Sequence, residues 1–300
     1  MRLRYIIAFM TAFLSMTGCI REDRSGCPGD VLLTFLYTGD GFSDIFPDTI
    51  DEVALFIYSA ADNSFVSQMT LTKEELELNQ GAWLSLLPGD YRIVLWGNAF
   101  DRTEIDFGPD GAKVSEPGFY SSPEEYSGTD PLYYSSIEIS VPESLRDTRR
   151  ECVFKSSHIK MYVRLTGFRD IIGPDGDEIV IGVTHSGCPA YTDFFNIPSE
   201  DVRCDISPAL VEDPEDDESY ILTYNVLRFS EDDDTSLILY NAEDGSELYR
   251  LSIPDFIRKY GIAVDGMQEV TVAIQVTTGP IGIEISEWNI EDVKPGFDKG

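Results

Sequence analysis

The sequence has few of the residues that catalytic and metal sites most often use. Its 300 residues include two histidines, His158 and His185, and five cysteines, no two of which have the C-x-x-C spacing typical of zinc sites. No G-x-S-x-G nucleophile motif lies near either histidine, and the chain has no glycine-rich phosphate-binding motif. These absences predict a protein that is not an enzyme and binds no cofactor or metal. A hydrolase with two carboxylates stays open as an alternative, because the chain has 54 acidic residues.

Positive charge is also scarce. The chain has 22 basic residues and a formal net charge of −32, so phosphate backbones repel it and nucleic acid is excluded as a partner. The acidic runs Glu212–Glu218 and Glu231–Asp234 lack the alternating ligands and central glycine of an EF-hand loop. We expect both runs to be solvated loops, with calcium binding as the alternative.

Long apolar runs are missing apart from one at the N-terminus. Tyr5–Leu14 is apolar except for Thr11 and follows two arginines, but it is shorter than the ~20 residues that span a bilayer. This pattern is typical of a secretory signal peptide, which we assign to residues 1–18. Met16–Cys19 resembles the lipobox of bacterial lipoproteins, in which the cysteine is lipidated and becomes the first mature residue.

The lipobox predicts that Cys19 carries a diacylglyceryl group and that the mature chain is a lipoprotein of a Gram-negative outer membrane. Ile20 stands where an Asp would resemble an inner-membrane retention signal, and Glu22-Asp23 resembles a signal for transfer to the cell surface. We therefore expect a lipid-anchored, surface-exposed protein. An ordinary signal peptide with a chance cysteine is the alternative.

A period of two between apolar residues dominates the rest of the chain and predicts strands. The strands expected are residues 31–37, 53–58, 91–96, 159–165, 178–183, 237–240, 270–276 and 281–285. Short helices are expected after Thr72, which forms a capping box with Glu75, and after Ser252, which precedes Pro254. The chain is therefore predicted to be all-β with short helices.

An internal repeat suggests how the strands are divided. Leu55–Ser64 aligns without gaps on Leu237–Ser246, and each copy precedes an expected helix and a later strong strand, 91–96 or 270–276. This shared order predicts two tandem β-sandwich domains. We assign them to residues 19–150 and 151–300, because the charged segment Glu143–Arg150 interrupts the strand pattern.

Four cysteines remain beyond Cys19, an even number that suggests disulfides in an oxidising compartment. Cys27 and Cys152 each precede an expected strand, and Cys188 and Cys204 flank a loop-rich stretch. We predict the pairs 27–152 and 188–204, although four cysteines allow three connectivities.

One segment, Leu86–Asn98, places a turn at Pro88-Gly89 before a strand. The side chains of Tyr91, Ile93 and Leu95 share one face of that strand, and Trp96 lies on the other. We expect Trp96 to pack in a core rather than bind a ligand.

This segment, together with Arg21–Pro28, Val226–Phe229 and Glu287-Trp288-Asn289, resembles the fimbrium anchor lipoproteins, which hold fimbriae of Gram-negative anaerobes to the outer membrane. The resemblance runs along nearly the whole chain. It implies two transthyretin-like sandwiches, no enzymatic activity, and a fimbrial stalk subunit (a fimbrillin) as the partner. A surface adhesin or glycan-binding lipoprotein is the alternative, because fold does not determine function.

Fimbriae of this family assemble by strand exchange, in which an extended segment of one subunit completes the sheet of a neighbour. The candidate segment lies near the C-terminus and includes Ile281, Ile283, Ile285 and Trp288. The alternative is that this segment is only the closing strand of the second sandwich.

Overall fold

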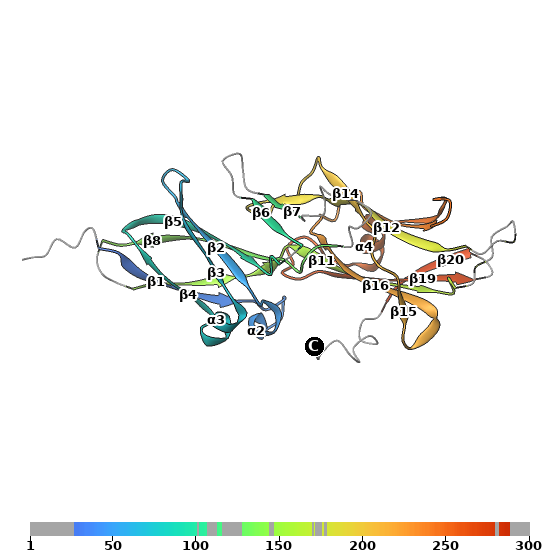
Figure 1. Cartoon of the computed structure of the whole chain (residues 1–300), viewed down its shortest axis with the longest axis horizontal. Helices are drawn as coiled ribbons and strands as arrows, with labels where there is room; N and C mark the ends of the chain where they lie inside the picture. The colour runs from blue at the N-terminus through green and yellow to red at the C-terminus, as the bar shows by residue number, and fades with distance from the viewer. Residues whose placement is uncertain are drawn as a thin grey trace, which may run out of the picture.

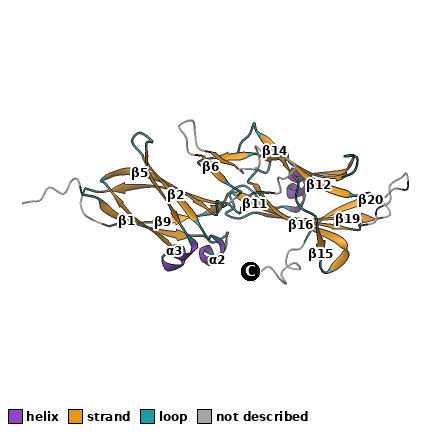
Figure 2. Cartoon of the chain, in the orientation of Figure 1, coloured by secondary structure: helices purple, strands orange, loops and turns teal. Residues whose placement is uncertain are grey.

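The computed structural model shows two β-sandwiches that follow one another along the chain (Figure 1). It describes residues 27–100, 102–106, 113–115, 128–143, 147–169, 171, 176, 179–279 and 282–288. Strands dominate, and the helices are short (Figure 2). The predicted all-β fold class is confirmed.

The first sandwich packs a sheet of order β4-β1-β9 on a sheet of order β10-β8-β5-β2-β3. Its strands are β1 (Gly29–Leu36), β2 (Val53–Ser59), β3 (Phe65–Leu71), β4 (Gly81–Leu86), β5 (Gly89–Gly97), β8 (Tyr133–Val141), β9 (Thr148–Val153) and β10 (Lys155–Ser156). Alternate residues of the two sheets, such as Leu33 and Leu95, meet in its core. The helices α2 (Phe46–Thr49) and α3 (Lys73–Leu78) add Phe46 and Leu76 to that core.

The second sandwich packs a sheet of order β15-β16-β11-β19-β20 on a sheet of order β14-β12-β17-β18. Its strands are β11 (His158–Thr166), β12 (Ile181–Pro189), β14 (Arg203–Ile206), β15 (Val211–Asp213), β16 (Asp216–Leu227), β17 (Ser236–Asn241), β18 (Glu247–Ser252), β19 (Thr271–Gly279) and β20 (Gly282–Glu287). The helix α4 (Ile253–Tyr260) buries Phe256 and Ile257 in this core.

Both expected helix starts are confirmed. Thr72 and Glu75 make both hydrogen bonds of the capping box before α3, and the Ser252 side chain accepts a hydrogen bond from the Asp255 amide at the start of α4. Gly261 ends α4 in the left-handed conformation, with φ of 68°.

The internal repeat is a β-hairpin followed by a helix. Each residue of the first hairpin has its equivalent 182 positions later in the second hairpin, as Leu55 has in Leu237. The bulge falls at Ile57/Tyr58 in the β2–β3 hairpin and at Leu239/Tyr240 in the β17–β18 hairpin. Both turns also close with the same backbone hydrogen bonds, such as Ser59 N to Ser64 O and Asn241 N to Ser246 O, each 2.9 Å. The repeat therefore extends to hydrogen bonding.

The sequence predicts that the strands at residues 91–96 and 270–276 correspond to one another in the two repeats, and this prediction is wrong. The sequence also does not predict the second strand of each hairpin, β3 or β18. Strand β5 pairs with β2 in the same sheet, whereas β19 lies in the opposite sheet and pairs in parallel with β11. The element that corresponds to β19 is β9, because β9 pairs in parallel with β1 as β19 does with β11. Apolar alternation cannot distinguish these pairings, since it specifies a face and not a neighbour.

The change from one sandwich to the other comes later than the predicted boundary after residue 150. Strand β9 (Thr148–Val153) pairs with β1, and β10 (Lys155–Ser156) pairs with β8, so both belong to sheets of the first sandwich. The charged residues Arg149 and Arg150 are tolerated because β9 is an edge strand with exposed positions.

The two sandwiches meet through the outer face of the β10-β8-β5-β2-β3 sheet. Phe56, Val94 and Trp96 on that face form a buried cluster with Phe194 and Leu227 of the second sandwich. Trp96 has no exposed surface. A small sheet of β6 (Glu104–Asp106), β7 (Lys113–Ser115) and β13 (Tyr191–Asp193) adds a second connection, because β13 of the second half pairs with β7 of the first.

Truncating Trp96 should loosen this junction. We expect Trp96→Ala to lower the free energy of unfolding by about 3–5 kcal/mol, because a large aromatic side chain leaves a cavity between two sheets. Trp83→Ala is the matched control, since Trp83 is 56% exposed and its loss should change stability by less than about 1 kcal/mol. Equilibrium denaturation in urea measures both, and equal losses for the two variants would contradict the burial assigned to Trp96.

Candidate functional site

Two of the predicted site residues, Cys19 and Ile281, lie outside the described residues. Cys27 is the first residue that the structure describes, two positions before β1. The lipid on Cys19 therefore stays a prediction.

The predicted Cys27–Cys152 disulfide is wrong. Cys152 lies opposite Phe35 in the parallel β1–β9 pair, whereas Cys27 precedes the start of β1. Eight residues of extended chain separate Cys27 from Phe35, which is roughly 26 Å at the rise of a strand. Cys27 is exposed, Cys152 is buried, and neither is in a disulfide. Cys27 precedes β1 as predicted, whereas Cys152 lies within β9, a strand that the sequence did not predict and that runs parallel to β1.

Cys188 and Cys204 lie directly opposite one another on the antiparallel strands β12 and β14. Opposite residues in an antiparallel pair have Cα atoms about 4.5–5.5 Å apart, within the range that disulfides span. In the structure each sulfur instead contacts a backbone carbonyl, of His185 at 3.8 Å and of Pro189 at 3.7 Å respectively. Burial raises the pKa of the Cys188 thiol well above its usual value, so oxidation is slow once the strands have closed.

We predict that Cys188 and Cys204 are bridged in the exported protein and that Cys27 and Cys152 are not. Closing the loop of about 15 residues should stabilise the fold by about 3 kcal/mol on the chain-entropy estimate. Because the buried thiol resists oxidation, the bridge should form when the chain refolds in an oxidising buffer but not when the folded, reduced chain is oxidised. Non-reducing peptide mapping checks this, and a 188–204 peptide missing from the exported protein would refute it.

The predicted strand-exchange segment is a paired strand of this chain. Strand β20 forms an antiparallel hairpin with β19, from Gly279↔Gly282 to Ile274↔Glu287. Ile283 and Ile285 are half-buried against the second core, and Trp288 is buried, with its amide donating to Ala273 O at 3.1 Å. Within this structure β20 acts as the closing strand of its sheet, as the alternative expected.

The other edge of β20 is nevertheless open. Strand β20 ends the order β15-β16-β11-β19-β20, so one row of its backbone groups has no neighbouring strand among the described residues. It is tethered by the Tyr260 hydroxyl, which donates to Ile285 O at 3.0 Å, and by Arg164, whose guanidinium lies 5.9 Å from the Trp288 ring centre. The candidate residues Ile283 and Ile285 therefore lie on an edge strand, and Trp288 directly follows it.

A polar cluster that the sequence analysis missed joins the two sandwiches. The Tyr37 hydroxyl donates to Glu269 at 2.5 Å, and Lys160 forms an ion pair with the same carboxylate. Asp40 accepts hydrogen bonds from the backbone amides of Gln268 and Glu269 at 2.8 and 3.0 Å. These contacts tie the segment after β1 to the segment before β19. More than 200 residues separate Tyr37 and Asp40 from their partners along the chain, so no local pattern could reveal these contacts.

The charge of this cluster is stabilised by its own hydrogen bonds. Burial raises the pKa of Glu269, but hydrogen bonds from Lys160 and Tyr37 outweigh burial and the pKa is lowered. Burial and the hydrogen bond to Glu269 both raise the pKa of Tyr37. At neutral pH the cluster therefore holds an ionised carboxylate and a neutral phenol.

Arg228 adds a second polar tie between the sandwiches. Its guanidinium donates to Ser156 O at the end of the first sandwich, at 2.9 Å. It also donates to Val264 O and Met267 O in the loop before β19, at 2.6 and 2.5 Å. Arg228 lies in one of the segments that carry the family resemblance, so the role of that segment is to join the two halves.

Both histidines are fully buried. His158 Nδ1 lies 2.8 Å from Leu132 O, and His185 Nδ1 lies 3.2 Å from the Tyr224 hydroxyl. Burial lowers the pKa of each imidazole to about 4, so both are neutral at physiological pH. The neighbouring serine hydroxyl and cysteine thiol contact the backbone of these residues and not their rings: Ser156 Oγ donates to His158 O, and the Cys188 thiol donates to His185 O. These positions agree with structural roles.

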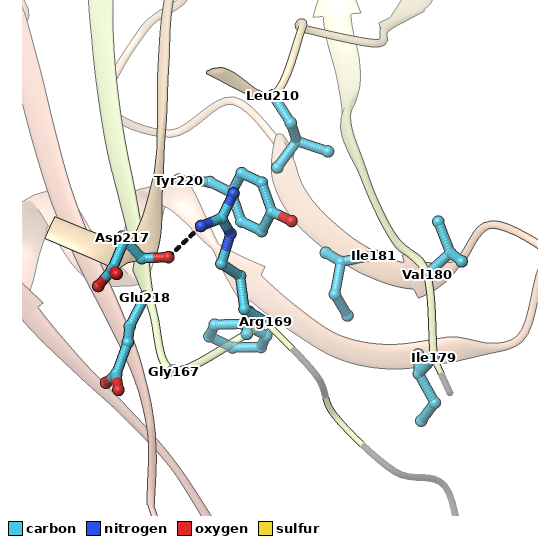
Figure 3. A pocket seen from close by; sticks show the side chains of 10 residues that line it. Gly167, Arg169, Ile179, Val180, Ile181, Leu210, Asp217, Glu218 and Tyr220 are labelled. Carbon is cyan, nitrogen blue, oxygen red and sulfur yellow. Dashed lines mark hydrogen bonds between the residues drawn. The ribbon is translucent and has the colours of Figure 1, made fainter. Parts of the chain in front are cut away.

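A pocket of about 850 Å³ lies at one end of the second sandwich (Figure 3). Phe168, Ile181 and Leu210 form its apolar wall. Arg169 lies over the Tyr220 ring at 5.4 Å from its centre and donates to Asp217 O (Figure 3). The guanidinium therefore covers one face of the Tyr220 ring.

Other site types lack support in the described part of the chain. No cluster of three or more histidine, cysteine or acidic side chains there is arranged to hold a metal ion. Within the same residues, no helix is both long enough and apolar enough to cross a bilayer.

Solved structures with the same fold define the class to which this double sandwich belongs. The fimbrial anchor protein Mfa2 from Porphyromonas gingivalis superposes with a TM-score of 0.66 at 13% identity, covering 87% of this chain and 98% of that one. A candidate polysaccharide-binding protein from Bacteroides thetaiotaomicron gives 0.68 at 13% identity, covering 88% and 99%. A candidate adhesin from the same species gives 0.65 at 15%, covering 87% and 97%. The fold is thus shared by a fimbrial anchor and by proteins described as candidate binding proteins.

The family is shown by the sequence. Residues 24–294 match the model of the fimbrillin-A associated anchor proteins Mfa1 and Mfa2, and the chain belongs to this family. No curated protein matches the chain. The family resemblance inferred from the sequence segments is therefore confirmed.

Proposed function

We propose that this protein is an outer-membrane lipoprotein that anchors the base of a fimbrium to the cell surface without catalysing a reaction. Its membership of the anchor family over residues 24–294 is the observation that carries the proposal. The lipid on Cys19 would hold the membrane, and a fimbrial stalk subunit would be held by strand exchange.

The arrangement of β1 supports an anchoring role. The segment between Cys19 and β1 is short, so a pull on the lipid acts directly along β1. Strand β1 lies in the middle of its sheet, paired over six residues with β4 and over six with β9. Such a pull must shear both ladders at once, and the polar cluster around Glu269 then passes the load from the end of β1 to the second sandwich.

The arrangement of β20 supports the strand-exchange contact. It is an edge strand, and its core-facing residues Ile283 and Ile285 are half-buried rather than fully buried. An edge strand with alternating apolar side chains is the element that β-augmentation uses. We propose β20, continued by Trp288, as the contact with the stalk subunit.

An adhesin or glycan-binding lipoprotein is the second candidate function. The pocket beside Tyr220 and Arg169 is the observation that favours it, because aromatic and charged side chains together suit sugars. The anchor proposal is preferred because Arg169 covers the Tyr220 ring, and because the family match is to anchor proteins.

Replacing the lipidated residue tests the membrane part. Cys19→Ala should move the protein out of the membrane fraction or leave its signal peptide uncleaved, since no other residue would accept the lipid. Cys27→Ala is the matched control and should stay membrane-bound, because Cys27 lies outside the lipobox. Fractionation with lipid labelling measures both. Membrane retention with normal labelling of Cys19→Ala would end this part of the proposal.

Locking β20 to its own sheet tests the strand-exchange part. Thr277 and Glu284 lie directly opposite one another on β19 and β20, and neither is buried. Thr277→Cys with Glu284→Cys should form a disulfide that keeps β20 paired with β19. If β20 leaves β19 to enter a stalk subunit, the locked protein should shed fimbriae into the medium while remaining on the membrane.

Thr277→Cys alone and the reduced double variant are the controls for the lock, and both should keep their fimbriae. Electron microscopy and immunoblots of the medium give the readout. Fimbriae that stay attached when the lock is fully formed would show that β20 does not leave its sheet.

A further inference from the structure

The edges of the four sandwich sheets are protected unequally. Charged side chains on an edge strand hinder pairing with another chain. Six of the eight edge strands carry them: β9 (Arg149, Arg150, Glu151), β10 (Lys155), β14 (Arg203, Asp205), β15 (Glu212, Asp213), β18 (Glu247, Arg250) and β20 (Glu284, Glu287). The other two, β3 and β4, have no charged residue in a chain that is 25% charged.

Of these two strands, β3 is the more open. Its first six residues, Phe65 to Thr70, are all exposed, and they include three large apolar side chains: Phe65 at 48%, Val66 at 43% and Met69 at 36%. Strand β4 instead alternates between buried and exposed positions and is joined to β3 through α3. Among the described residues β3 pairs with β2 alone, so one row of its backbone groups has no neighbouring strand there.

The internal repeat supplies a direct comparison. Strand β18 is the equivalent of β3 in the second hairpin, with the same partner register and the same bulge. Where β3 has Phe65 and Gln68, β18 has Glu247 and Arg250, which form an ion pair at 2.6 Å along the edge. Identical backbone geometry therefore carries a charged edge in one copy and an apolar edge in the other. Hairpin folding does not require the apolar edge.

We propose that β3 is a docking edge that accepts an extended strand of a different polypeptide, free of acidic side chains, as a sixth strand of the β10-β8-β5-β2-β3 sheet. The strand would add main-chain hydrogen bonds along β3 and cover Phe65, Val66 and Met69. This surface is separate from β20 and does not depend on the fimbrial role.

The charges at the two ends of β3 indicate which kind of strand can bind there. Asp62 lies in the turn before β3, and Glu74 and Glu75 lie in α3 directly after it. The one cation there, Lys73, is already paired with Asp51 at 2.9 Å. Antiparallel pairing of two copies would bring Asp62 of one against Glu74 and Glu75 of the other, and parallel pairing would align like carboxylates. A second copy of this chain, at a net charge of −32, is therefore disfavoured, and a strand with neutral or basic ends fits.

Site-specific photo-crosslinking of the full-length lipoprotein in its own cells tests the proposal. A benzoylphenylalanine at position 66 is the probe, and the same residue at position 248 of β18 is the matched control, because Val66 and Leu248 are equivalent and both exposed. We expect an adduct at position 66 and none at position 248. Mass spectrometry should map the adduct to one contiguous segment of another polypeptide without acidic residues.

A second variant shows whether the adduct reports strand pairing. Phe65→Glu with Gln68→Arg copies the ion pair of β18 onto β3, and the equivalent hairpin shows that this backbone accommodates it. It should lower the yield of the adduct about tenfold, because charged side chains block an edge. Phe65→Leu with Gln68→Met keeps the edge uncharged and should keep the adduct. Thermal unfolding of each purified variant confirms that it is folded.

An adduct with a second copy of this chain, with a glycan or with an acidic segment would overturn the proposal. So would the absence of an adduct at position 66, or an adduct that survives the charged pair. Membrane fractionation of the same cells scores the lipid anchor separately, so failure of the β3 inference is distinguishable from failure of the anchoring role.

Discussion

Burial of Trp96 between the two sandwiches is the contact on which the arrangement of the molecule depends. Strand β5 is apolar on both faces: Ile93 and Leu95 face the first core, while Val94 and Trp96 face outward. A sheet with two apolar faces must be covered on both, and the second sandwich supplies the cover through Phe194 and Leu227. The two halves are therefore joined by a core and not only by a linker.

Polar contacts around this apolar junction give it a defined geometry. Glu269 and Arg228 are partly buried charges, and each is satisfied by partners from both sandwiches. Satisfied buried charges contribute more to a unique arrangement than to net stability, because desolvation offsets much of their attraction. In the proposed role, where tension passes from a membrane to a filament, one fixed arrangement of the halves would transmit force without first straightening a hinge.

The resemblance segments acquire distinct roles in this arrangement. Leu86–Asn98 supplies the two-faced strand β5 and ends at Asn98, which is buried and accepts a hydrogen bond from the Asp51 amide at 2.8 Å. Val226–Phe229 contributes Leu227 and Arg228 to the junction. Trp288 follows β20 and ties its end to β19 through the hydrogen bond from its amide to Ala273 O. Leu86–Asn98 and Val226–Phe229 therefore join elements that are distant in the chain.

The sequence by itself determined the structural features that depend only on residues close together in the chain. The period-two strands, the caps at Thr72 and Ser252, the repeated segments Leu55–Ser64 and Leu237–Ser246 and the two faces of β5 all follow from local sterics and hydrogen bonding, and all were predictable. Only the tertiary structure decided which strands became neighbours. It placed Cys152 beside Phe35 rather than Cys27, moved β9 into the first sandwich, and brought Glu269 to Tyr37. It also left β3 at the edge of its sheet among the residues that the structure describes, because a strand is an edge only through the absence of a neighbour, and its own residues do not encode that absence.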